Sequence, residues 1–282
     1  TTRNRYILTK MLCGFNYNCY FCFKKSSMTT QNEYKLRTLF QLLQPGYIVT
    51  TSWLNEMGIS KDLKKYYLKS GWLEALGRGA YKKPGDHVEW QGALNVIQKQ
   101  LETKVHVGGL SALSLQGFSH YFRFASETLY LFTPANTKLP KWFSDYNWNY
   151  ELFHKQSNFL PDDMGLRQIE VKSIPVEIST PERAILECLL LAPQVFDLVE
   201  CYQLFEGLVN LKPKLVSELL VNCGSVKVKR LFLYMAEKIN HQWFQFLKTD
   251  NIDLGKGHRT LSNNGVYNAK YMISIPKELD QL

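Results

Sequence analysis

The stretch from Glu33 to Pro84 carries a series of helix and turn signals that few small folds can satisfy. Apolar residues at helical spacing first form a single stripe, and Pro45-Gly46 ends that helix. Two shorter helical segments follow, separated by Gly58, where a left-handed backbone costs least. Two short helices joined by a turn with glycine are typical of a helix-turn-helix. We expect helices at about residues 33–44, 52–57 and 61–70, with a short extended piece at 47–49.

Capping and turn residues refine this prediction. Thr50 or Thr51 can cap the second helix and Ser60 the third, and Gly71 can close the third. Two short extended segments then flank a glycine-rich turn that contains Arg78. A basic hairpin directly after a helix-turn-helix predicts a wing, so residues 28–84 are expected to form a winged helix-turn-helix.

The positive charge of the chain is concentrated at its N-terminal end. Residues 28–84 contain nine Lys/Arg and four acidic residues, residues 1–27 add five basic residues and no acid, and the remainder carries a net charge of −1 out of the total of +9. A basic domain joined to a nearly neutral body indicates a polyanionic partner, most simply DNA.

The predicted third helix suggests which residues contact DNA. Its lysines are expected mainly on one side, while Leu63 and Tyr67 lie toward the opposite side and pack on the other helices. Recognition helices present their N-terminal residues to the major groove, and an arginine on a wing can reach a minor groove or a phosphate. A solvated, merely solubilising face and a protein-binding winged helix are the alternatives. The candidate DNA-binding residues are Ser60, Lys61, Lys64, Lys65, Lys69, Arg78 and Lys82.

The first 27 residues differ from the rest in composition and show no periodicity. A signal peptide would need an uninterrupted apolar run and a small-residue cleavage site, which this segment lacks. A metal site at Cys13, Cys19 and Cys22 would rest on one C-x-x-C without a second ligand pair. We favour an over-long gene start or an added leader, with Met28 as the natural beginning.

Several blocks of sequence resemble a known family. They are GISKDLKKYYLKSGWLEALGRGAYKKPGDHVEWQGALNVIQKQL, VHVGGLSALSLQGFSHYF, STPERAILECL, PKLVSELLVNCGSVKVKRLFLYMAE and IDLGKGHRTL followed by KYMISIP. In this order they resemble the AbiEi antitoxins of bacterial abortive-infection, or type IV toxin–antitoxin, operons. The resemblance spans about Met28 to the end of the chain.

The resemblance implies an autorepressor whose winged helix binds inverted repeats in its own operator. It implies that residues 85–282 form an antitoxin domain that antagonises a nucleotidyltransferase-like toxin. A cytoplasmic protein without catalytic activity follows from it, and the absence of a long apolar run excludes a membrane-spanning helix. The alternatives are a one-component regulator with a C-terminal effector-binding domain and a nucleotidyltransferase enzyme.

The C-terminal region predicts a mixed α+β domain, so the whole chain is expected to be α+β. Gly108-Gly109 resembles the glycine pair of nucleotidyltransferase active sites, but no acid occurs between Gly109 and Glu127 and no Asp-x-Asp follows. We therefore interpret the glycines as tight strand-to-helix packing. The histidines lack zinc-site spacing, and we expect neither a metal nor a cofactor.

Further C-terminal patterns predict local structure. Ser179 and Glu182 fit a capping box that opens a helix at 183–191, and helices are expected near 199–208, 213–222 and from 226. The last of these carries Lys227, Lys229, Arg230 and Lys238, a basic face that contacts an acidic toxin surface, operator DNA or only solvent. Residues 255–259 predict a basic hairpin turn, Asp162-Asp163 an exposed loop, and residues 265–276 strands.

Overall fold

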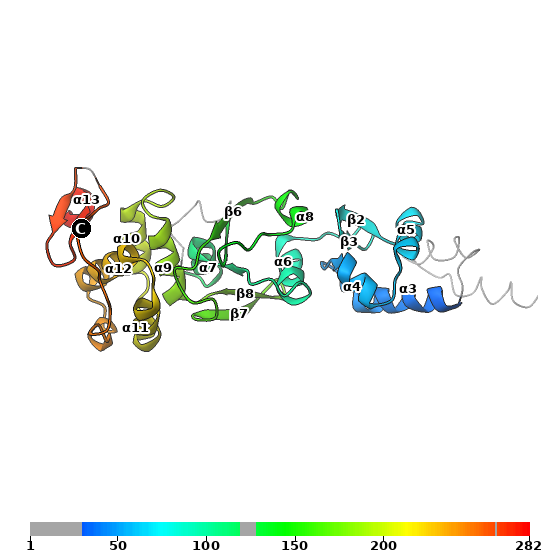
Figure 1. Cartoon of the computed structure of the whole chain (residues 1–282), viewed down its shortest axis with the longest axis horizontal. Coiled ribbons are helices and arrows are strands. Elements are labelled where there is room, and N and C mark those ends of the chain that lie inside the picture. The colour runs from blue at the N-terminus through cyan, green and yellow to red at the C-terminus, as the bar shows by residue number, and fades with distance from the viewer. Residues whose placement is uncertain (1–29, 119–127, 263) are drawn as a thin grey trace, which may run out of the picture. The chain divides into compact units, whose positions relative to one another are not determined.

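The computed structural model describes residues 30–118, 128–262 and 264–282 (Figure 1). The residues fall into two compact units that divide after Val88, with Glu89–Leu282 forming the second. Cys13, Cys19 and Cys22 lie outside the described residues. Within the described part of the chain, no helix combines the length and apolar character needed to cross a membrane.

The N-terminal unit has the order of elements predicted for a winged helix-turn-helix. Its three-stranded sheet has the order β1-β3-β2, and both pairings are antiparallel. The elements are α3 (Thr30–Leu42), β1 (Val49–Thr50), α4 (Thr51–Glu56), α5 (Lys61–Lys69), β2 (Glu74–Gly77) and β3 (Ala80–Lys82).

Local side-chain chemistry sets the ends of these helices. The Thr50 hydroxyl accepts a hydrogen bond from the Trp53 N–H at 3.3 Å, and the Ser60 hydroxyl accepts one from the Leu63 N–H at 3.2 Å. Each hydroxyl satisfies one of the N–H groups that a helix start leaves unpaired. Gly58, between the two helices, has φ of +71°, as the predicted turn requires.

A hydrophobic core joins the three N-terminal helices. Tyr67 of α5 is fully buried and its hydroxyl donates to the Asn32 carbonyl at 3.1 Å. Burial raises the pKa of Tyr67 to about 12, and Tyr66 adds to the shift. Leu63 is partly buried against the same core, which confirms the side of α5 that was predicted to face inward. The buried aliphatic members of this core cluster are Leu36, Leu39, Leu43, Val49, Leu54, Ile59 and Leu73.

The second unit is built on a five-stranded mixed sheet of order β6-β5-β4-β8-β7. The β5–β6 and β4–β8 pairs are parallel, whereas β4–β5 and β7–β8 are antiparallel. The α+β prediction is confirmed for both units. The strands are β4 (His106–Val107), β5 (Thr128–Thr133), β6 (Glu151–Gln156), β7 (Leu166–Val171) and β8 (Ile174–Ser179).

Helices cover this sheet and extend beyond it. Helix α6 packs on β8, and α10, α11 and α12 gather around α9 (Figure 1). The helices are α6 (Trp90–Lys99), α7 (Gly109–Leu115), α8 (Lys141–Ser144), α9 (Pro181–Leu191), α10 (Leu198–Glu206), α11 (Pro213–Asn222), α12 (Val226–Ile239), the 3-10 turn η2 (Phe244–Phe246) and α13 (Lys277–Gln281).

A small second sheet follows α12 and confirms the strands expected in residues 265–276. Its order is β10-β11-β9, from β10 (Val266–Asn268), β11 (Ile273–Ile275) and β9 (Arg259–Thr260). Because β9 pairs parallel with β11, the prediction of a basic hairpin turn at residues 255–259 was wrong. Residues 255–258 form a loop that leads into β9, which begins at Arg259.

The predicted capping box at the start of α9 was also wrong. The N-cap is Thr180, and its side chain makes no capping hydrogen bond. Ser179 instead donates to the Glu187 carboxylate at 2.8 Å, and Glu182 accepts from the Lys212 N–H at 2.9 Å. Tertiary hydrogen bonds therefore replaced the local pair that the sequence suggested.

The basic face predicted for α12 is mostly internal, so it does not form a partner surface. Arg230 is fully buried, and its guanidinium donates to the carbonyls of Leu254, Gly255, Gly257 and Met272. Lys229 is buried, Lys227 donates to the Leu190 and Ala192 carbonyls, and Lys238 donates to the Asp280 carbonyl. These cations hold the end of α9 and the C-terminal segments against α12.

Replacing Arg230 with Ala should lower the free energy of unfolding by at least about 3 kcal/mol, because a fully buried side chain is lost together with its charged hydrogen bonds to four carbonyl groups. Arg230→Lys should recover only part of this, since an ammonium cannot reach four acceptors in a plane. Urea unfolding measures the effect. Lys256→Ala, an exposed change in the same loop, is the control and should stay within about 0.5 kcal/mol. An equally small effect for Arg230→Ala would contradict this role.

Candidate nucleic-acid interface

Three lysines form one exposed face of α5. Lys61, Lys65 and Lys69 follow one another at four-residue intervals, so they share a side of the helix, and all three are exposed. The buried Tyr67 lies on the opposite side. Lys65 lies 3.9 Å from Asp62, but the two side chains are 66% and 94% exposed, so this pair leaves the ammonium accessible. The face presents three cations to an incoming polyanion.

Ser60 begins this face. Its hydroxyl oxygen accepts the capping hydrogen bond of α5, and the residue is exposed. The hydroxyl proton remains free to donate to a base edge or a phosphate oxygen. Ser60 therefore combines a structural role with a position at the N-terminal end of the helix, where recognition helices approach bases.

Arg78 is the exposed tip of the wing. It lies between Gly77 and Gly79, and Gly79 has φ of +94°, a conformation that favours glycine. The Gly79 carbonyl accepts a hydrogen bond from the Thr51 N–H at 2.9 Å. This bond ties the turn to the start of α4, so Arg78 projects from a fixed loop.

Two other candidates, Lys64 and Lys82, are engaged within the unit. The Lys64 Nζ lies 3.3 Å from the Thr51 hydroxyl and 5.2 Å from the centre of the Tyr81 ring. The Lys82 Nζ pairs with the Glu74 carboxylate at 3.2 Å and donates to the Asp86 carbonyl at 2.8 Å, and its side chain is only 13% exposed. Both lysines fasten the wing and α5 to the rest of the unit.

Two further lysines, which were counted in the net charge but not predicted to contact DNA, also bond within the unit. The Lys35 Nζ donates to the Gly58 carbonyl at 2.6 Å and supports the turn between α4 and α5. The Lys83 Nζ donates to the Phe40 carbonyl at 3.1 Å. No sequence pattern distinguishes such a lysine from an exposed one, because the acceptors are backbone carbonyls distant in the chain.

The second unit contains a buried polar network around Glu187. Its Oε1 lies 2.8 Å from both Arg183 Nε and His106 Nε2, and its Oε2 accepts from the Gly109 N–H and the Ser179 hydroxyl at 2.8 Å. Burial alone would raise the pKa of Glu187. The His106 and Arg183 charges and these hydrogen bonds outweigh it, so the pKa is lowered.

This network explains the glycine pair at the start of α7. A Cβ on Gly108 would lie 2.3 Å from the Glu187 carboxylate and 2.4 Å from the Phe132 ring. Gly109 has φ of +51°, and its N–H donates to Glu187. The interpretation of the glycines as tight strand-to-helix packing is confirmed. Glu187, the acid beside them, accepts four hydrogen bonds and acts as a structural carboxylate.

Two family models match the chain. One, described as a transcriptional regulator, AbiEi antitoxin N-terminal domain, matches residues 32–124. The other, described as a transcriptional regulator, AbiEi antitoxin of a type IV TA system, matches residues 126–276. No curated protein matches at a significant level. The crystal structure of the RV2827C protein from Mycobacterium tuberculosis has a similar fold, with a TM-score of 0.53 and 13% identity over 88% of this chain and 92% of that chain.

Gly108→Ala should lower the free energy of unfolding by about 3 kcal/mol or more, because the added methyl group displaces either the Phe132 ring or the buried carboxylate. Thermal or urea unfolding tests this. The control is Gly224→Ala, where the nearest atom to the new Cβ lies at 3.8 Å and the change should cost less than about 1 kcal/mol. Equal stability of the two variants would show that the Gly108 backbone is not constrained by Glu187.

Proposed function

Since the chain belongs to the AbiEi family of antitoxin transcriptional regulators from type IV toxin–antitoxin systems, we propose that it represses its own operon by binding inverted repeats in the promoter. We propose further that it antagonises a nucleotidyltransferase-like toxin encoded in that operon. The winged helix-turn-helix supplies the first activity, and the unit formed by Glu89–Leu282 supplies the second.

The observation that carries the DNA-binding proposal is the exposed basic face of α5 together with the wing arginine. In a major groove, the N-terminal end of α5 places Ser60 and Lys61 closest to base edges. Lys65 and Lys69 then follow the helix toward the phosphates, where lysines fix position rather than sequence. Arg78 reaches a neighbouring phosphate or minor groove. Inverted repeats suit two copies of such a unit related by two-fold symmetry.

The assignment of toxin antagonism to the second unit rests on family membership and on charge. Residues 85–282 carry a net charge of −1, so they have little general attraction for DNA. Two basic residues of α12, Arg230 and Lys229, are buried and not available to a partner, which reduces this attraction for DNA further. A nearly neutral unit suits a partner that is a protein.

The triple variant Lys61→Ala, Lys65→Ala, Lys69→Ala should bind the promoter DNA upstream of its own gene at least tenfold more weakly at moderate salt. The slope of log K against log salt should flatten by about 2–3, since each lost phosphate contact removes about 0.9 from it. Gel-shift titrations at several salt concentrations measure both quantities. Lys64 is left intact because it also positions the wing.

The matched control removes three exposed lysines of the second unit, Lys138, Lys214 and Lys277. It changes the net charge by the same amount, and its affinity should stay within about twofold of the parent. The α5 assignment is refuted if the two triple variants bind DNA alike.

The same α5 variant should still neutralise the toxin. When it is expressed from a foreign promoter beside the adjacent nucleotidyltransferase-like gene, growth rescue should match that of the parent, because the change leaves Glu89–Leu282 intact. Colony counts after toxin induction provide the readout. Loss of rescue at equal protein level would mean that toxin antagonism depends on the DNA-binding face.

A further inference from the structure

The second unit contains a cavity of about 300 Å³ beside the buried Glu187 network. Residues from β4, β5, β8, α9 and the loop between β6 and β7 line it. Its volume lies at the lower limit of roughly 300–1,000 Å³ that is typical of small-molecule sites. Any ligand of this cavity is therefore small.

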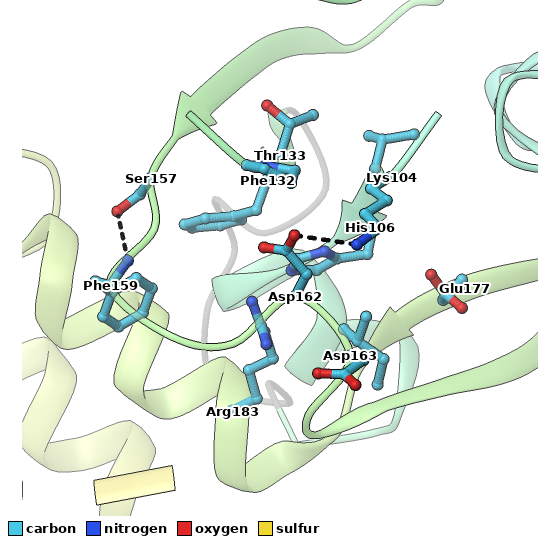
Figure 2. A pocket seen from close by; sticks show the side chains of 13 residues that line it. Lys104, His106, Phe132, Thr133, Ser157, Phe159, Asp162, Asp163, Glu177 and Arg183 are labelled. Atoms are coloured by element: carbon cyan, nitrogen blue, oxygen red, sulfur yellow. Dashed lines mark hydrogen bonds and ion pairs between the residues drawn. The ribbon is translucent and has the colours of Figure 1, made fainter. Parts of the chain in front are cut away.

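Arg183 provides a fixed guanidinium with one N–H group that is accessible from this cavity. Its side chain is 5% exposed; Nε bonds to Glu187, and Nη1 donates to the Pro161 and Met164 carbonyls at 2.6 and 2.7 Å. Within the described residues, Nη2 has no hydrogen-bond partner. Figure 2 shows the guanidinium extending from α9 toward the space bounded by Phe132, Phe159 and Asp162. Nη2 is not among the fully buried polar atoms without a partner, so this N–H faces the open part of the cavity, where an acceptor on a ligand can reach it.

The cavity also carries two acids whose carboxylates have no partner among the described residues. Glu177 is bonded only through its backbone, to Gln98, and Asp163 is exposed at the rim. A third acid, Asp162, pairs with Lys104 at 3.2 Å (Figure 2). The lining thus presents unpaired acceptors as well as the unpaired donor on Arg183.

This combination restricts the chemistry of the ligand. A phosphate or nucleotide would place several negative charges beside Asp163 and Glu177, and a simple amine would make no use of the accessible Arg183 N–H. A molecule with one carboxylate and one ammonium group satisfies both sides. The Phe132 and Phe159 rings add apolar walls for a side chain.

We propose that this cavity is a binding site for a small zwitterion of the free amino acid class. The ligand carboxylate accepts from Arg183 Nη2, and the ligand ammonium donates to Asp163 and Glu177. Because Glu187 and two carbonyls already hold Arg183 in place, the carboxylate site is formed before the ligand arrives. The site is independent of the exposed face of α5.

The test is a thermal-shift panel of the full chain with each of the twenty L-amino acids at about 10 mM, followed by calorimetric titration of each ligand that shifts the melting temperature. At least one should raise Tm by about 5–10 °C once it exceeds its Kd about a hundredfold. The matching amine without the carboxylate and the matching acid without the ammonium should each fail to do so. The proposal is overturned if no amino acid shifts Tm, or if an amine or acid counterpart binds as well.

The decisive variant is Asp163→Asn with Glu177→Gln, since both side chains lack partners in the described structure and their loss should not disturb folding. It should weaken binding at least tenfold. Asp145→Asn with Asp250→Asn removes two exposed acids outside the cavity and should leave affinity unchanged. Arg183→Lys should also weaken binding, with circular dichroism checking that the variant is folded. Equal affinity in the cavity and control double variants would refute the site.

Discussion

The buried carboxylate of Glu187 is the interaction on which the second unit depends. It joins β4 through His106, α7 through the Gly109 N–H, β8 through Ser179 and its own helix through Arg183. A buried carboxylate is costly unless all its acceptor sites are used, so these four segments must assemble around it together. The same network fixes Arg183, which in turn holds the Pro161 and Met164 carbonyls of the segment that also supplies Asp162 and Asp163 to the cavity.

The winged helix could be predicted from sequence because its determinants are local. Ser60 caps the helix that begins at the next residue, and Gly58 occupies a turn that spans only a few residues. The start of α9 shows the opposite case. Ser179 and Glu182 have the spacing of a capping box, yet their side chains bond to Glu187 and to the Lys212 N–H. When a polar side chain can bond either to a nearby or to a distant group, burial determines which hydrogen bond forms. Sequence spacing does not encode burial.

The Glu187 network was not predicted for the same reason. Its members lie up to 81 residues apart, whereas the two-metal pattern of a nucleotidyltransferase would need acids that follow the glycine pair closely in the chain. The absence of such acids argued against a two-metal site but gave no sign that a distant glutamate lies against Gly108. The glycine pair itself was the sequence signal: it indicated that another group packs closely against the backbone, but it did not identify that group.

Formal charge and effective charge differ throughout this chain. Lys35, Lys83, Lys227 and Arg230 all donate to backbone carbonyls, so their charges are engaged within the fold. Counterion release counts only cations that reach phosphates. If α5 and the wing contact DNA as proposed, their few exposed cations set the salt dependence of binding, which is then smaller than the basic pI suggests. A count of basic residues points to the N-terminal unit, but it does not separate the lysines that bond to backbone carbonyls from those whose side chains are exposed.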